Sequence, residues 1–110
     1  MKPLDVTLLV QRQIEASAWS PDDDQQNPHG IDLARCLVEP PVHQTYLDSF
    51  NDNAPIDLWL VLREMPGGHG GYEVVFSEAE GDFGLAVRGD DGQGVLIGMY
   101  GSFPETLTSM

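Results

Sequence analysis

Four short apolar segments, each followed by turn-forming residues, occupy the second half of the chain. The segments are rich in Val, Leu, Phe and Tyr, which favour strands, and Gly, Pro, Asp and Asn separate them. Strands this short, joined by turns this tight, are typical of antiparallel hairpins. The predicted strands cover residues 56–63, 72–76, 83–88 and 95–100. The unbroken apolar run over residues 58–62 indicates burial on both faces, so we expect that strand to be central.

The first half of the chain is less regular. Apolar residues recur at helical spacing over residues 4–18, and Pro3 suits a first helical turn, so we predict a helix there. The β-branched residues within 6–10 leave a short strand as the alternative. Residues 20–30 have the composition of a loop. Two further strands are predicted, over residues 31–38, where Pro40 and Pro41 follow, and over residues 42–50.

The C-terminal segment has a readable helix start. Ser102 followed by Glu105 forms a capping box, and Pro104 falls in the first turn. Phe103 and Leu107 can meet on one face of this helix. The whole chain, residues 1–110, is therefore predicted to be one α+β domain. It should hold an N-terminal helix, an antiparallel meander sheet of three to five strands, and a short C-terminal helix that covers one face of the sheet.

Charge limits the function classes that remain. The chain has 18 acidic residues and 5 basic ones, a formal net charge of −13. So few bases cannot neutralise many phosphates, which argues against nucleic-acid binding and against docking on anionic lipid. The lone Cys36 cannot form an intramolecular disulfide, and no signal peptide or membrane span is evident. We therefore expect a cytoplasmic protein whose partner is basic.

Catalytic and metal-binding patterns are weak. Residues 22–24 are three adjacent aspartates, which lack the alternate spacing and closing Glu of a calcium loop, so a solvated loop is the better interpretation. The three histidines and Cys36 show no zinc or nucleophile spacing. Acidic pairs within residues 78–82 are expected to be solvated, with ordinary pKa values. The sequence therefore predicts no enzyme, no cofactor and no metal.

Four segments of the second half carry a resemblance: residues 58–64, 71–76, 83–86 and 100–107. In these strand and turn residues the chain resembles small bacterial immunity proteins that are found beside polymorphic toxin genes. The resemblance covers about the last 55 residues. It implies that the protein neutralises a cognate toxin, and it implies no catalytic residues, because such families share none.

The leading hypothesis is an immunity protein that blocks the active site of a basic, nuclease-type toxin with its carboxylates. Charge mainly gives association rate and specificity, so exposed aromatic residues should add affinity. We expect Trp19 and Tyr46 to be such exposed anchors. The expected partner-binding carboxylates are Asp22, Asp23, Asp24, Glu78, Glu80, Asp82, Asp90 and Asp91.

Two other classes stay open. The first is a non-catalytic homodimeric accessory or structural protein, in which an edge strand near Val38 or Val95 pairs across a two-fold axis. The second is a metal-dependent or small-ligand enzyme, which would be stabilised on binding calcium, zinc or a metabolite. Sedimentation of the purified chain and thermal-shift measurements separate these classes from the first hypothesis.

Overall fold

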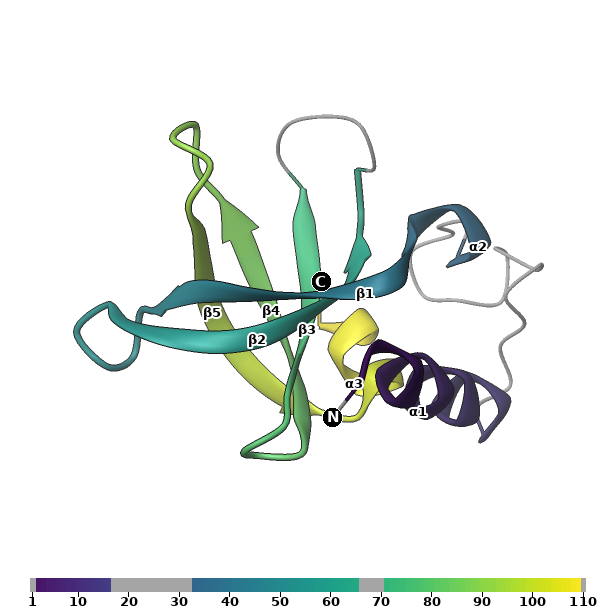
Figure 1. The fold of residues 1–110 in the computed structure, drawn as a ribbon. Coiled ribbons are helices and arrows are strands. Elements are labelled where there is room, and N and C mark those ends of the chain that lie inside the picture. Colours follow the sequence, from purple (N-terminus) through teal and green to yellow (C-terminus); the bar gives the residue numbers. More distant parts are fainter. Residues whose placement is uncertain (1, 17–32, 66–70, 110) are drawn as a thin grey trace.

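The computed structural model describes residues 2–16, 33–65 and 71–109. Within these ranges an N-terminal helix is followed by a helical turn, five strands and a short C-terminal helix (Figure 1). Consecutive strands pair antiparallel, and the sheet closes into a barrel between the first strand and the last. The predicted α+β class is confirmed, with the meander at the upper end of the expected number of strands.

Helix α1 spans Pro3–Ala16, which decides between the helix and the strand alternatives for this segment. Its buried residues are Val6, Val10 and Ile14, each four positions after the last. This spacing puts all three on one helical face, which packs on the barrel. The backbone N–H of Lys2 donates to Asp5 Oδ2 at 2.8 Å, so an acidic residue stands at the positive end of the helix dipole.

The predicted strand over residues 31–38 is wrong in its first part. Residues Leu33–Cys36 form a helical turn, α2, and strand β1 then runs from Leu37 to Asp48 without stopping at the proline pair. Proline lacks an N–H donor, and it is tolerated here because the β1–β2 ladder is interrupted between Leu37 and Val42. What looked like two strands separated by Pro40 and Pro41 is therefore one strand.

The four predicted hairpin strands are confirmed. They are β2 (Ala54–Arg63), β3 (Tyr72–Ser77), β4 (Asp82–Arg88) and β5 (Gly94–Gly101). β2 pairs with β1 on one side and β3 on the other, and residues 58–62 are all buried, as expected of a central strand.

The barrel closes through a short parallel pairing that the sequence did not predict. Leu47 pairs with Val95 and Asp48 with Leu96, which makes a seam between β1 and β5. Val95 also pairs with Val87 of β4, so it has a strand on each side and is not a free sheet edge. The edge that the homodimer hypothesis places near Val95 is therefore already occupied within the chain.

The buried residues form two clusters on opposite faces of β3, because successive strand side chains alternate. Val74 and Phe76 belong to the larger cluster, which also contains the buried face of α1. Val75 belongs to a smaller cluster that includes Tyr46 and Leu58. Glu73 is two residues before Val75, so it faces the same way as the smaller cluster. This alternation brings a carboxylate into the barrel.

Helix α3, Phe103–Thr108, begins as predicted. Ser102 is the N-cap, and its Oγ accepts a hydrogen bond from the backbone N–H of Glu105 at 3.2 Å. Phe103 is fully buried and contacts the ring of Phe83 edge-on. The Phe103 backbone N–H donates to Gln13 Oε1 of α1 at 2.6 Å. The two helices therefore lie together on one side of the barrel (Figure 1), bound to the larger cluster.

Candidate functional site

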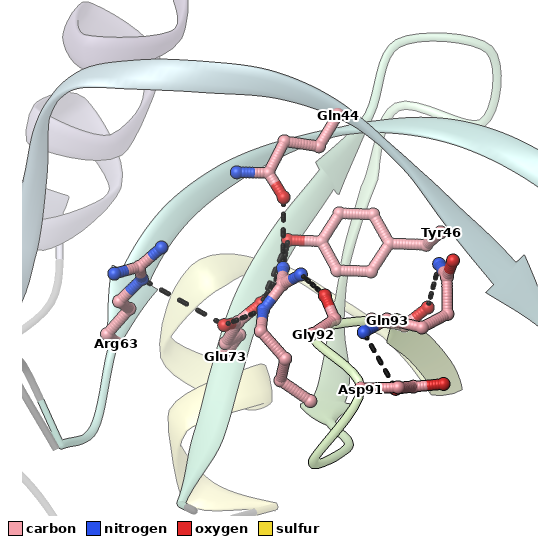
Figure 2. A network of polar contacts seen from close by, with 9 residues as sticks. Gln44, Tyr46, Arg63, Glu73, Asp91, Gly92 and Gln93 are labelled. Carbon is pink, nitrogen blue, oxygen red and sulfur yellow. Dashed lines mark hydrogen bonds and ion pairs between the residues drawn. The ribbon is translucent and has the colours of Figure 1, made fainter. Parts of the chain in front are cut away.

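A buried ion pair lies at one end of the smaller cluster. Glu73 of β3 is only 6% exposed, and Arg88 at the end of β4 binds it with both arms of the guanidinium. The Nε–Oε2 and Nη2–Oε1 distances are each 2.9 Å. Such a bidentate ion pair has fixed geometry, and it offsets the desolvation cost of burying the carboxylate. Figure 2 shows Gln44, Tyr46 and Arg63 arranged around Glu73.

Tyr46 is not the exposed anchor that the sequence suggested. It is fully buried, and its hydroxyl donates to Glu73 Oε1 at 3.0 Å. Burial raises the pKa of Tyr46 above its ordinary value, and the nearby Glu73 charge raises it further. The Tyr46 side chain points into the barrel because a phenol ring can be buried there when its hydroxyl has a hydrogen-bond partner. Tyr46 is thus a structural residue, with its ring also beside Gly94.

Arg88 joins this interior network to the β4–β5 turn. Its Nη1 donates to the carbonyl oxygen of Gly92 at 2.6 Å, and its Nη2 donates to Gln44 Oε1 at 2.9 Å. The hydrogen bonds to Glu73 raise the pKa of Arg88, so the group stays charged. Arg63, whose Nε lies 3.9 Å from Glu73 Oε2, is a second and more exposed cation beside the same carboxylate. The positive charge of Arg88 is therefore paired with the carboxylate of Glu73 inside the barrel.

The β4–β5 turn is the predicted Asp-Gly hairpin and carries two of the predicted site residues. Asp90 and Asp91 are both exposed. Gly92 has a φ of 82°, a conformation that favours glycine at this position. The Asp91 carboxylate accepts a hydrogen bond from the backbone N–H of Gln93 at 3.0 Å, which fixes its direction. Asp90 extends from an ordered turn rather than from a loose loop.

The other predicted acidic turn lies at the opposite end of β4. Glu78 and Glu80 are exposed and Asp82 is half-buried. Consecutive turns of a meander alternate between the two ends of the strands, and the seven residues of β4 span about 20 Å. The structure therefore does not bring these carboxylates together with Asp90 and Asp91, and they form two separate acidic sites.

Glu78 departs from the expectation of an ordinary carboxylate. The indole Nε1 of Trp59 donates to Glu78 Oε1 at 2.6 Å, and this hydrogen bond lowers the pKa of Glu78. The ring of His43 lies against Trp59, with centroids 4.7 Å apart, and the proximity of His43 lowers the same pKa slightly further. The hydrogen bond from Trp59 to Glu78 therefore attaches the β3–β4 turn to strand β2.

The β1–β2 turn is a feature that the sequence reasoning missed. Phe50 at this turn is 75% exposed, the most exposed large apolar side chain of the described residues, and it stands between Asp48 and Asp52. The turn is ordered: the Phe50 N–H donates to Asp48 Oδ1 at 3.0 Å, and Ser49 Oγ donates to the Leu96 carbonyl at 2.6 Å. The available signal was an aromatic residue inside an otherwise polar turn, where no core can receive it.

The β1–β2 and β4–β5 turns lie at opposite ends of the β1–β5 seam, because the two strands are parallel and one turn follows β1 whereas the other precedes β5. The first begins directly after Asp48 and the second ends directly before Gly94, and these two residues flank the paired positions Leu47 and Val95. We call Phe50 and Asp52 at one end of the seam, together with Asp90 and Asp91 at the other, the seam surface. All four are exposed, whereas Asp48 beside Phe50 is half-buried. Neither turn contains a Lys or Arg. Carboxylates therefore lie at both ends of the seam, and the exposed aromatic residue lies at the end that holds Asp52.

Four predicted site residues lie outside the described residues: Trp19, Asp22, Asp23 and Asp24. Within the described ranges, no group of His, Cys, Asp and Glu side chains is arranged to hold a metal ion. Nor does any helix in those ranges have the length and apolarity needed to cross a bilayer. A groove lined by Val10, Gln11 and residues 37–39 lies between α1 and β1, and it brings no cluster of titratable groups together.

Comparisons of the chain with known protein families, with curated proteins and with solved structures find no significant match.

Proposed function

We propose that this protein is an immunity protein that neutralises a basic, nuclease-type toxin by covering the toxin's active site with carboxylates. The observation that carries the proposal is the seam surface, which has exposed carboxylates at both ends of the seam and an exposed aromatic side chain at one of them. A nuclease active site is basic because it grips phosphate, so a surface of fixed carboxylates complements it.

The distribution of cations supports this assignment. Lys2 and Arg12 lie on or beside α1, and Arg35 lies in α2, away from the two turns of the seam surface. Arg88 is the cation next to the β4–β5 turn, and Glu73 pairs with it. Arg63 is 46% exposed and lies beside the same carboxylate, on β2 and not in either turn. A basic partner that approaches the seam surface therefore meets carboxylates and no Lys or Arg of the two turns.

Phe50 supplies an apolar contact for the partner, which carboxylates alone do not provide. Complementary charge speeds association and selects the partner, whereas most binding energy comes from a few well-buried side chains, aromatic ones above all. An exposed Phe held by an ordered turn loses little freedom when it is buried. It serves here as the anchor that the sequence had placed at Tyr46.

The test is co-expression with the toxin encoded beside the gene, followed by affinity purification at low ionic strength. We expect a complex that weakens as salt is raised. Asp90→Lys should slow association about tenfold, because a steering carboxylate becomes a repelling cation. Asp90 suits this test because no hydrogen bond of the fold depends on its side chain among the described contacts.

The matched control is Glu15→Lys, which makes the same charge change on the exposed end of α1. Measured at an ionic strength of about 0.1 M, it should leave the association rate within about twofold of the unmodified protein, because charge effects are then screened over about 10 Å. Absence of a complex at low salt would refute the proposed function. Equal slowing by both variants would refute the seam surface as the binding site.

A further inference from the structure

We infer that Arg88 is a positioning residue that holds the β4–β5 turn in the shape in which Asp90 and Asp91 meet the toxin. The inference rests on the proposed function and adds to it a specific determinant inside the barrel. Arg88 lies at the base of the β4–β5 hairpin, and its hydrogen-bond donors reach both into the turn and into the barrel.

One arm of Arg88 reaches into the turn. Arg88 pairs with Gly94 across the base of the hairpin, and its Nη1 donates to the Gly92 carbonyl at 2.6 Å. The turn also has its own backbone hydrogen bond, from the N–H of Gly89 to the Gln93 carbonyl at 3.0 Å. The guanidinium therefore fixes the turn at a point beyond its base, one residue after Asp91.

The other donors of Arg88 hold the guanidinium to the barrel. Nε and Nη2 bind the two carboxylate oxygens of Glu73, and Nη2 also donates to Gln44 Oε1. These partners belong to β3 and β1, so the planar group joins two strands to the turn. Figure 2 labels three of these partners, Gln44, Glu73 and Gly92. A lysine carries the same charge but a single nitrogen, and cannot satisfy partners spread around a rigid fork.

The ion pair with Glu73 also affects how the charge of Arg88 acts on the turn. Because Arg88 is paired with a carboxylate that is 6% exposed, its charge is not available to Asp90 or Asp91. Neither aspartate forms an ion pair with a described residue. The same interaction that fixes the turn thus leaves the charges of Asp90 and Asp91 without an ion-pair partner among the described residues.

The test uses the full chain with Arg88→Lys, a variant of unchanged net charge. Hydrogen exchange at the Gly92 and Gln93 amides should become about tenfold faster, because a charge-assisted hydrogen bond to the turn is lost. Exchange at Val74 and Val75 in β3 should stay as it is. Against the toxin encoded beside the gene, dissociation should become about tenfold faster with an unchanged association rate, since charge is kept and geometry is not.

A second variant keeps the inference testable if Arg88→Lys loosens the whole barrel. The double variant Glu73→Leu/Arg88→Leu replaces the ion pair by apolar groups and also keeps net charge unchanged. It should give the same faster exchange at the turn with a protected β3. Arg12→Lys on α1 is the matched control and should change neither exchange nor dissociation.

The outcomes separate the two proposals. If the unmodified protein binds no toxin, the proposed function fails, and with it the positioning role. If the toxin binds but both variants leave turn exchange and dissociation unchanged, the role of Arg88 alone is refuted. Faster exchange with unchanged dissociation also refutes it, because the turn geometry then does not matter to the partner.

Discussion

The hydroxyl of Tyr46 donates a hydrogen bond to the Oε1 atom of Glu73, 27 residues further along the chain and inside the barrel. The same oxygen accepts a hydrogen bond from Arg88. A buried carboxylate with both a neutral and a charged donor is well compensated, and the described residues hold no buried side-chain polar atom without a partner. Substitutions of Tyr46 or Glu73 should therefore lower the stability of the fold.

Tyr46→Phe should lower the free energy of unfolding by about 1–2 kcal/mol, because Glu73 keeps its charged partner and loses its neutral one. Urea denaturation followed by circular dichroism measures the change. Tyr100→Phe is the control: Tyr100 is 37% exposed, and its hydroxyl can bond to water in either state, so an effect near zero is expected. Equal losses in the two variants would show that the hydrogen bond to Glu73 adds nothing.

Glu73→Ala should lower the free energy of unfolding by about 3 kcal/mol or more, because it leaves the charge of Arg88 without its carboxylate. The double variant Glu73→Leu/Arg88→Leu should cost far less, within about 1 kcal/mol of the unmodified protein, since apolar groups replace both charges. Denaturant unfolding of the single and double variants gives the coupling between the two residues. Additive effects would contradict a coupled pair.

Glu78 should make stability depend on pH in acid. Its hydrogen bond from Trp59 lowers its folded-state pKa below the ordinary 4.5, so the stabilisation is present above that value. It is then lost as pH falls through the lowered pKa. The melting temperature of Glu78→Gln should therefore fall less between pH 5 and pH 3, to be checked by calorimetry. Parallel curves for the two proteins would contradict the assignment. The Trp59 indole N–H resonance should shift over the same acid range in the unmodified protein alone.

Gly94→Ala should be strongly destabilising, because a methyl group there would lie 2.5 Å from the ring of Tyr46. Overpacking of this kind costs about 1–3 kcal/mol. Gly89→Ala is the matched variant in the same hairpin, where the nearest atom is a carboxylate oxygen of the exposed Asp91 side chain at 3.0 Å, and its cost should be under about 1 kcal/mol because that side chain can shift. Thermal unfolding of both variants tests the contrast, and a smaller loss for Gly94→Ala would contradict the packing of Tyr46 in the barrel.

Phe50→Ala should change the free energy of unfolding by less than about 0.5 kcal/mol, because the side chain is 75% exposed. Its effect should appear in toxin binding, as faster dissociation with an unchanged association rate. Surface plasmon resonance separates the two rates. Val42→Ala, at another exposed apolar position, is the control and should leave both unchanged. A slower association of Phe50→Ala would point to altered steering instead of a lost anchor.

The sequence alone determined α1, the four hairpin strands and α3, but neither α2 nor the continuous strand β1. Short apolar runs separated by turn-forming residues defined the hairpins, and Ser102 with Glu105 defined the start of α3, because these signals act between residues a few positions apart. The helical spacing of Val6, Val10 and Ile14 likewise sufficed for α1.

Only the tertiary structure decided the barrel closure and the site. The pairing of Leu47 with Val95 joins residues 48 positions apart, and no local pattern encodes it. That closure turns Tyr46 inward, gathers Glu73 and Arg88 around it, and leaves Phe50 outside. The physical reason is that exposure and charge pairing depend on which distant strands become neighbours, whereas turns and caps depend on the backbone geometry of consecutive residues.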